Sequence, residues 1–165
     1  MTMEHKNLAG LSREELAAEV VAMGEKPFRS KQLWHWIYHR GETEFDRMTT
    51  LAQPLRTALA ETYVVKRPLV SNIQTSGDRT RKWLVQFGDH QEAETVFIPE
   101  DDRGAVCISS QVGCTLTCTF CRTGTQKLVR NLTAAEIVGQ FMLARDSYDE
   151  WPTPTDGGRL ISNIV

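Results

Sequence analysis

The chain has 165 residues, of which 41% are hydrophobic and 24% are charged, and its formal net charge is −2 at pH 7. This length and apolar content are those of a folded domain with a core, accompanied at most by a small satellite. No run of about 18 apolar residues occurs, and residues 1–8 hold neither a hydrophobic segment nor a cleavage pattern. We therefore expect no membrane insertion, no secretion and a cytoplasmic location.

Net charge gives no global argument for nucleic-acid binding, which ordinarily accompanies a strongly basic domain. The charges are nevertheless segregated along the chain. Residues 26–40 carry basic side chains and no acidic one, and residues 66–82 carry several basic side chains with Asp78 as their one acid. Acidic residues collect between Asp89 and Asp102. Such segregation is as consistent with solvated helix faces as with a basic surface that neutralises phosphates.

Residues 8–65 have the pattern of three amphipathic helices. A capping box formed by Ser12 and Glu15 opens the first, and glycines end the first two. Trp34 and Trp36 in the second helix are expected in the core rather than as platforms for nucleobases. The expected helices cover residues 13–23, 27–40 and 51–63.

From residue 68 the pattern changes to that of β-strands. Turn residues at 76–78 and 88–90 separate segments that alternate or are rich in β-branched and aromatic residues, which predicts an antiparallel meander. The expected strands cover residues 69–75, 80–87 and 94–99.

The last third of the chain has the pattern of a βαβ unit. A strand at 105–109 leads into a cysteine-rich loop, and a capping box at Thr133 and Glu136 opens a helix that ends near residue 147. The apolar run 160–165 is typical of a buried parallel strand. Because such a strand rarely ends a domain, we expect the sequence to be cut from a longer protein.

Three cysteines, Cys114, Cys118 and Cys121, stand in a CxxxCxxC spacing. Structural zinc sites and electron-carrying clusters are normally closed by four ligands, so a local triplet indicates a [4Fe–4S] cluster with one iron left open for a substrate. Gly113 and small threonines would let the loop wrap a cluster closely, and Phe120 would shield one side from water.

Two alternatives use the same cysteines. Zinc would need Cys107 as its fourth thiolate, but the spacing from Cys107 to Cys114 is not that of a zinc knuckle and no His lies near the run. Disulfide pairing is less favoured, because three cysteines within eight residues would strain most pairings.

The CxxxCxxC spacing resembles that of the radical S-adenosylmethionine (SAM) superfamily. Four further strings surround it in order, namely GEKPFRSKQLW at 24–34, ETVFIPE at 94–100, CISSQVGC at 107–114 and NLTAAEI at 131–137. Together they resemble the RlmN family, dual-specificity RNA methyltransferases that methylate C2 of adenosine. The resemblance implies an α/β fold with a helical RNA-binding module at residues 1–66, a linking β meander at 67–99, and the truncated start of a partial (β/α)6 barrel at 100–165.

The resemblance also implies the reaction and its partners. C2 of adenine is not nucleophilic, so one SAM first methylates an enzyme cysteine, and a second SAM yields the radical that activates this methyl group for addition to adenine. The substrates implied are 23S rRNA near the peptidyl-transferase centre and the tRNA anticodon loop, on unpaired adenosines. An external electron donor such as flavodoxin and a monomeric protein are expected. No residue of this chain matches the methyl-carrying cysteine, so the chain alone is expected to be inactive.

Roles in the family carry over to five residues. Cys114, Cys118 and Cys121 match the cluster ligands, Cys107 matches the resolving cysteine that forms a transient disulfide with the methyl carrier, and Glu94 matches the proton acceptor. From the residues alone, a lone Cys in an apolar strand is usually a small buried hydrophobe, and Glu94 is usually a solvated strand residue. Whether Glu94 or the Cys107 thiolate removes the C2 proton stays open.

Basic residues near the site are candidates for RNA contacts, with solvated loop charge as the alternative. The candidates are Lys26, Arg29, Lys31, Arg122, Lys127 and Arg130. Two other functions stay open: a different radical SAM enzyme, including one that methylates C8 of adenine, and a zinc-binding nucleic-acid module without catalysis.

Overall fold

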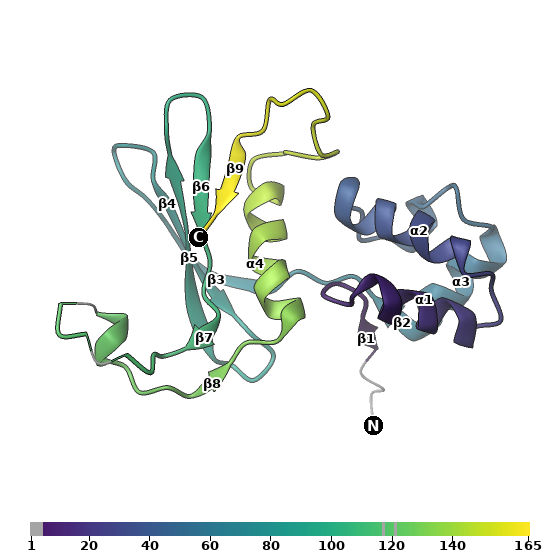
Figure 1. Cartoon of the computed structure of the whole chain (residues 1–165), viewed down its shortest axis with the longest axis horizontal. Helices are drawn as coiled ribbons and strands as arrows, with labels where there is room; N and C mark the ends of the chain where they lie inside the picture. The colour runs from purple at the N-terminus through teal and green to yellow at the C-terminus, as the bar shows by residue number, and fades with distance from the viewer. Residues whose placement is uncertain (1–4, 117, 121) are drawn as a thin grey trace.

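The computed structural model describes residues 5–116, 118–120 and 122–165. A helical module lies on one side, a five-stranded sheet on the other, and helix α4 (Ala134–Asp146) runs between them (Figure 1). The fold is therefore mixed α/β, as predicted. Within the described residues, no helix combines the length and the apolar character needed to cross a membrane.

The helical module contains the three predicted helices. Ser12 accepts a hydrogen bond from the Glu15 amide, and the Glu15 carboxylate accepts one from the Ser12 amide, so the predicted capping box is present. Two short strands pair in parallel beside the helices. The elements are β1 (Lys6–Asn7), α1 (Arg13–Ala22), α2 (Phe28–Trp34), a π-helical turn (His35–His39), a 3₁₀ turn (Phe45–Arg47), α3 (Gln53–Thr62) and β2 (Tyr63–Val64).

The second predicted helix is α2 continued by the π-helical turn, and it ends at Gly41, which has a φ of 69°. Trp36 is buried, and its Nε1 donates a hydrogen bond of 2.7 Å to Thr50 Oγ1. The prediction that Trp36 belongs to the core is confirmed. Trp34 packs against the same core but stays partly exposed.

The main sheet has the strand order β3-β4-β5-β6-β9. The first four strands are antiparallel neighbours, so the predicted meander is confirmed, while β9 pairs with β6 in parallel. The bounds are β3 (Leu69–Thr75), β4 (Arg81–Gln86), β5 (Glu92–Pro99), β6 (Gly104–Cys107) and β9 (Ile161–Ile164). Since β5 pairs with β6, one sheet crosses the boundary expected at residue 100, and that domain division stays a prediction.

Helix α4 has apolar side chains on two sides. Its capping box of Thr133 and Glu136 is formed as predicted. Ala144 and Ile137 pack with the sheet, whereas Met142 packs with the helical module. The strands β6 and β9 with α4 between them form the predicted βαβ unit.

One detail of this unit was predicted wrongly. The final strand was expected to be buried, but only Ile161 is, and the rest of β9 is exposed. The physical reason is its place at the edge of the sheet, where β6 is its one neighbouring strand among the residues that the structure describes. Whether the sheet begins a (β/α)6 barrel stays a prediction.

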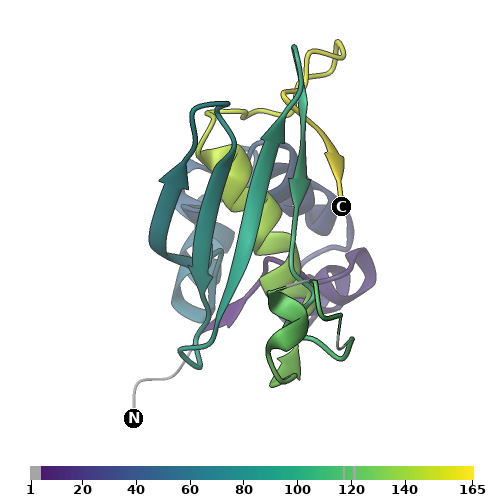
Figure 2. The same cartoon turned by 90° about the vertical axis from the view of Figure 1, so that its left-hand side faces the viewer.

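The sheet has one covered and one open face. Trp83, Val85, Thr95, Phe97 and Val106 alternate toward α4 and are buried. Figure 2 shows the opposite face of the sheet, over which no helix formed by the described residues lies. We call this the open face; it carries the alternate residues of the same strands.

Candidate active site

The cysteine loop extends from a small antiparallel pair of strands, β7 (Gln111–Val112) and β8 (Arg130–Asn131). Cys114 and Cys118 are free thiols with partly exposed side chains, whereas Cys121 lies outside the described residues. The Leu116 amide donates a hydrogen bond of 3.3 Å to Cys114 Sγ. Backbone N–H donors to cysteine sulfur stabilise thiolate ligands.

Two glycines allow the loop to close tightly. Gly113 has a φ of 77°, and a Cβ there would lie 2.0 Å from the Lys127 carbonyl oxygen. A Cβ on Gly124 would lie 2.7 Å from the carbonyl oxygen of Cys118. At Gly113 the backbone therefore lies close to that of Lys127, an approach that only glycine allows, while the wrapping of a cluster stays a prediction. The soft thiol donors and the hydrogen bond to Cys114 Sγ fit an iron–sulfur cluster.

The loop carries one exposed aromatic side chain and two of the described cysteines. Phe120, which is expected to shield one side of a cluster, has a side chain that is 93% exposed, and its shielding role stays a prediction. Cys107, Cys114 and Cys118 do not come together in a group able to hold a metal ion, judged over the part of the chain that the structure describes.

Glu94 and Cys107 lie on the open face. Glu94 is an exposed residue of β5, and Cys107 is the exposed last residue of β6. Cys107 is the cross-strand partner of Val96, two residues after Glu94, so Glu94 and Cys107 are diagonal neighbours. Diagonal neighbours have separations of about 7–8 Å. Their side chains therefore flank one patch of the open face, near the start of the cysteine loop.

A lysine accompanies Glu94 on this face. Lys82 Nζ of β4 lies 2.9 Å from Glu94 Oε1, and the two side chains line a hollow of about 90 Å³ with Asn72, Gln74 and Leu84. Both side chains are well exposed, so the ion pair contributes about 0–1 kcal/mol to stability. Its main effect is to orient the carboxylate of Glu94.

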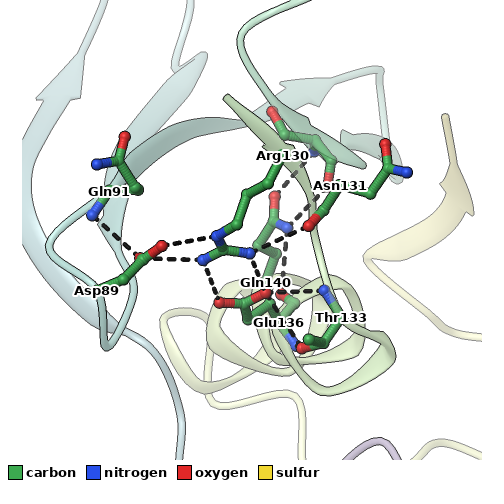
Figure 3. A network of polar contacts seen from close by, with 8 residues as sticks. Asp89, Gln91, Arg130, Asn131, Thr133, Glu136 and Gln140 are labelled. Atoms are coloured by element: carbon green, nitrogen blue, oxygen red, sulfur yellow. Dashed lines mark hydrogen bonds and ion pairs between the residues drawn. The ribbon is translucent and has the colours of Figure 1, made fainter. Parts of the chain in front are cut away.

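Arg130, one of the candidate RNA contacts, makes ion pairs within the protein. Its Nε lies 2.6 Å from Asp89 Oδ2, and its two terminal nitrogens lie 2.8 and 2.9 Å from the Glu136 carboxylate (Figure 3). Nη1 also donates to the Asn131 carbonyl oxygen. All three nitrogens are thus engaged within the protein, and the side chain ties β8 to the start of α4 and to the turn after β4. The two carboxylates raise the pKa of Arg130.

Arg130→Met is expected to weaken the acid dependence of stability. The hydrogen bonds from Arg130 lower the pKa of Asp89 from 3.8 to about 2 and also lower the pKa of Glu136. Carboxyls with a depressed pKa in the folded state stabilise it above their unfolded pKa and lose this effect as pH falls. The difference in free energy of unfolding between wild type and variant should therefore shrink between about pH 4.5 and pH 2. Urea unfolding at several pH values measures it.

Arg122→Met is the matched control, since Arg122 is exposed and pairs with no acid among residues 5–116, 118–120 and 122–165. It should follow the wild-type pH profile. A constant difference between wild type and Arg130→Met at all pH values would contradict the proposed linkage.

The other candidate RNA contacts lie in two places. Arg122 and Lys127 are exposed in the cysteine loop, and Lys26 and Lys31 are exposed near the start of α2. Arg29 is partly occupied, because its Nη1 donates to Gln32 Oε1 at 2.9 Å.

A groove of about 470 Å³ runs between α1 and α2, next to the basic residues near the start of α2. Lys31, Pro27 and Phe28 line it, together with Trp34, whose ring is covered by the Arg13 guanidinium at 4.9 Å. The groove thus combines aromatic rings with basic side chains.

Sequence reasoning missed Gln140 of α4. Its side chain is fully buried and bonds to both Thr95 and the backbone of Ser109. The available signal was a glutamine within the otherwise apolar stretch Ile137 to Ala144, a position where a polar side chain needs partners.

The chain was compared with known proteins. Residues 6–65 match the family model described as "Ribosomal RNA large subunit methyltransferase N-terminal domain". The protein "Dual-specificity RNA methyltransferase RlmN" of Rhodospirillum rubrum is 72% identical over 96% of this chain and 37% of its own length. The protein of the same name from Gluconobacter oxydans is 67% identical over 97% of this chain and 40% of its own length.

A solved structure is also similar. The radical SAM methyltransferase from Sphaerobacter thermophilus superposes with a TM-score of 0.80 at 36% identity, covering 96% of this chain and 45% of the other. The chain thus spans about two fifths of the length of the curated relatives named above. Over nearly all of its own length the chain is thus similar to proteins named "Dual-specificity RNA methyltransferase RlmN", and its helical module matches the family model of their N-terminal domain.

Proposed function

We propose that the protein carrying this chain is a radical SAM enzyme that methylates C2 of adenosine, at A2503 of 23S rRNA and A37 of tRNA. The observation that carries the proposal is the common placement of Glu94 and Cys107 on the open face, at the entrance to the cysteine loop. An acid and a thiol placed together there are the two protein groups that release of a C2-methylated adenine needs.

The cysteine loop would hold the [4Fe–4S] cluster through Cys114 and Cys118, with Cys121 as the third ligand that the spacing assigns. The cluster, with SAM, would supply the one-electron chemistry that makes the methyl carrier reactive. The loop's own contributions are the thiolate donors and the Leu116 N–H that bonds to Cys114 Sγ. Exposed Arg122 and Lys127 beside it would bind RNA phosphates.

Glu94 would take the C2 hydrogen of adenine as a proton, since its carboxylate is exposed and already held by Lys82. Cys107 would then attack the sulfur of the methyl carrier in a protein–RNA thioether. The new S–S bond forms as the S–C bond breaks, and the released electron pair stays on the methylene carbon, which takes a proton to become the methyl group. Cys107 is suited to this step because its thiol is free and exposed.

The helical module would bind the RNA body with the exposed lysines Lys26 and Lys31 and the adjoining groove. An external electron donor such as flavodoxin, and a monomeric state, stay predictions.

Iron content tests the ligand assignment. Anaerobic reconstitution of the full-length protein carrying this sequence should give a brown protein with about four irons, as the [4Fe–4S] stoichiometry requires. Cys114→Ser should lose most of this iron, because a hydroxyl is a poor ligand for the cluster. Cys107→Ser is the matched control and should keep it. A colourless protein with one zinc, lost on Cys107→Ser, would instead establish the zinc-binding alternative.

A further inference from the structure

Gln140 of α4 is a polar side chain with 0% exposure at the interface with the sheet. Its Oε1 accepts hydrogen bonds of 2.8 Å from Thr95 Oγ1 and 2.8 Å from the Ser109 amide. Its Nε2 donates to the carbonyl oxygens of Ser109 at 2.9 Å and of Glu136 at 3.1 Å. Both lone pairs and both protons of the amide are therefore used, which is the full capacity of a glutamine side chain.

The two bonds from Gln140 to Ser109 take the place of the hydrogen bonds that a neighbouring strand would make with Ser109. Strand β6 ends at Cys107, and the next residue but one, Ser109, has its N–H and its C=O bound by the Gln140 amide in the manner of a β-ladder. Buried backbone groups without a partner cost about 1–3 kcal/mol each. Gln140 thus fixes the backbone at the point where the chain leaves the sheet for the cysteine loop.

Ser109 is also bonded to the backbone of Glu94. Its Oγ donates a hydrogen bond of 2.8 Å to the Glu94 carbonyl oxygen. Thr95, the neighbour of Glu94, is itself fully buried and bonded to Gln140. One glutamine therefore links the backbone of Glu94 on β5 with the segment between Cys107 and Gln111.

A second contact ties the start of α4 to the cysteine loop. Glu136, whose carbonyl oxygen accepts from Gln140 Nε2, lies one turn earlier and holds Arg130 through its carboxylate (Figure 3). The two strands that flank the cysteine loop are thus tied to the same helix, β7 near Ser109 and β8 through Arg130.

We propose that Gln140 is a positioning residue that sets the place of Cys107 and Glu94 relative to each other, by binding the Ser109 backbone. Its side chain is fully buried, so it would act through the backbone that it binds. Its effect on backbone order is independent of the proposed methylation, whereas its effect on thioether release rests on that proposed function.

The backbone effect is tested by Gln140→Leu in the full-length protein, without any cofactor. Leucine has a similar volume but binds neither Ser109 group, so exchange of the Ser109 amide hydrogen should become about tenfold faster, the change that the loss of one hydrogen bond gives. Cys107 should also react faster with iodoacetamide, measured on its own peptide by mass spectrometry. The Val85 amide in the middle of the sheet should exchange as before.

Two controls separate positioning from general loss of stability. Met142→Ala removes a buried side chain from the same helix, on the side of the helical module, and should lower the melting temperature without accelerating the Ser109 amide selectively. Thr95→Val removes the hydroxyl and keeps both bonds to Ser109, so its Ser109 exchange should be close to wild type. Equal acceleration at Ser109 and Val85 in Gln140→Leu, or selective acceleration in Met142→Ala, would overturn the proposal.

The effect of Gln140 on thioether release is tested by comparison with Cys107→Ala. If that variant accumulates a protein–RNA adduct, Gln140→Leu should accumulate the adduct too. Met142→Ala should not accumulate it, even where the two variants lose the same number of degrees in melting temperature. Release of the adduct at the wild-type rate by Gln140→Leu would overturn the positioning role. If Cys107→Ala gives no adduct, the resolving role proposed for Cys107 fails, and the amide-exchange result alone decides on Gln140.

Discussion

Cys107→Ala in the full-length protein is expected to leave the enzyme covalently attached to its RNA. The substitution removes the only thiol that the structure places beside Glu94 among the described residues, so the thioether would form and persist. The attached RNA should appear as a slower band in a denaturing gel, which ribonuclease removes, and 2-methyladenosine release should fall by orders of magnitude because removal of a nucleophile has effects of that size.

Val96→Ala is the matched control, because Val96 is the cross-strand partner of Cys107 on the same face. It perturbs local packing and keeps the thiol, so turnover should continue and no adduct should accumulate. Ordinary product release by Cys107→Ala would remove Cys107 from the resolving role and leave Glu94 as the only assigned group on the open face.

Gly113→Ala is expected to abolish loading of the cysteine loop with iron. The backbone at Gly113 has a φ of 77°, which costs a residue with a Cβ about 1–2 kcal/mol. In addition, the new Cβ would lie 2.0 Å from the Lys127 carbonyl oxygen, so the loop would have to open beside Cys114. Iron and labile sulfide per protein after anaerobic reconstitution measure the effect.

Gly77→Ala is the matched control for this change. A Cβ at Gly77 meets nothing within 4 Å, and its φ is not in the left-handed region, so iron content should stay at the wild-type level. A Gly113→Ala protein with a full complement of iron would show that the close approach to Lys127 is not needed to form the site.

Local signals in the sequence predicted the elements well. The capping boxes at Ser12 and Thr133 involve residues three apart, and the turns of the meander lie within four residues, so the pattern contains all the interacting groups. Burial of β9 was predicted wrongly, since an apolar run does not indicate which neighbours are present to cover it.

Contacts between distant segments were not predictable in the same way. Arg130 binds Asp89, which is 41 residues away, and Gln140 binds Ser109, which is 31 residues away. The type of a charged or polar residue does not identify its partner, so the sequence alone gives Arg130 as a candidate RNA contact or a solvated loop charge. The ligand cysteines were recognisable because their spacing is itself local, whereas roles for Glu94 and Cys107 came from resemblance to a family.

Helix α4 has a thermodynamic consequence for the whole molecule. Because Met142 belongs to the core of the helical module and Ala144 to that of the sheet, neither core is complete without this helix. The module and the sheet should therefore melt in one cooperative transition, and a protease that cuts between them should not release a stable helical fragment. RNA bound to the module would accordingly stabilise the strands that carry Glu94 and Cys107.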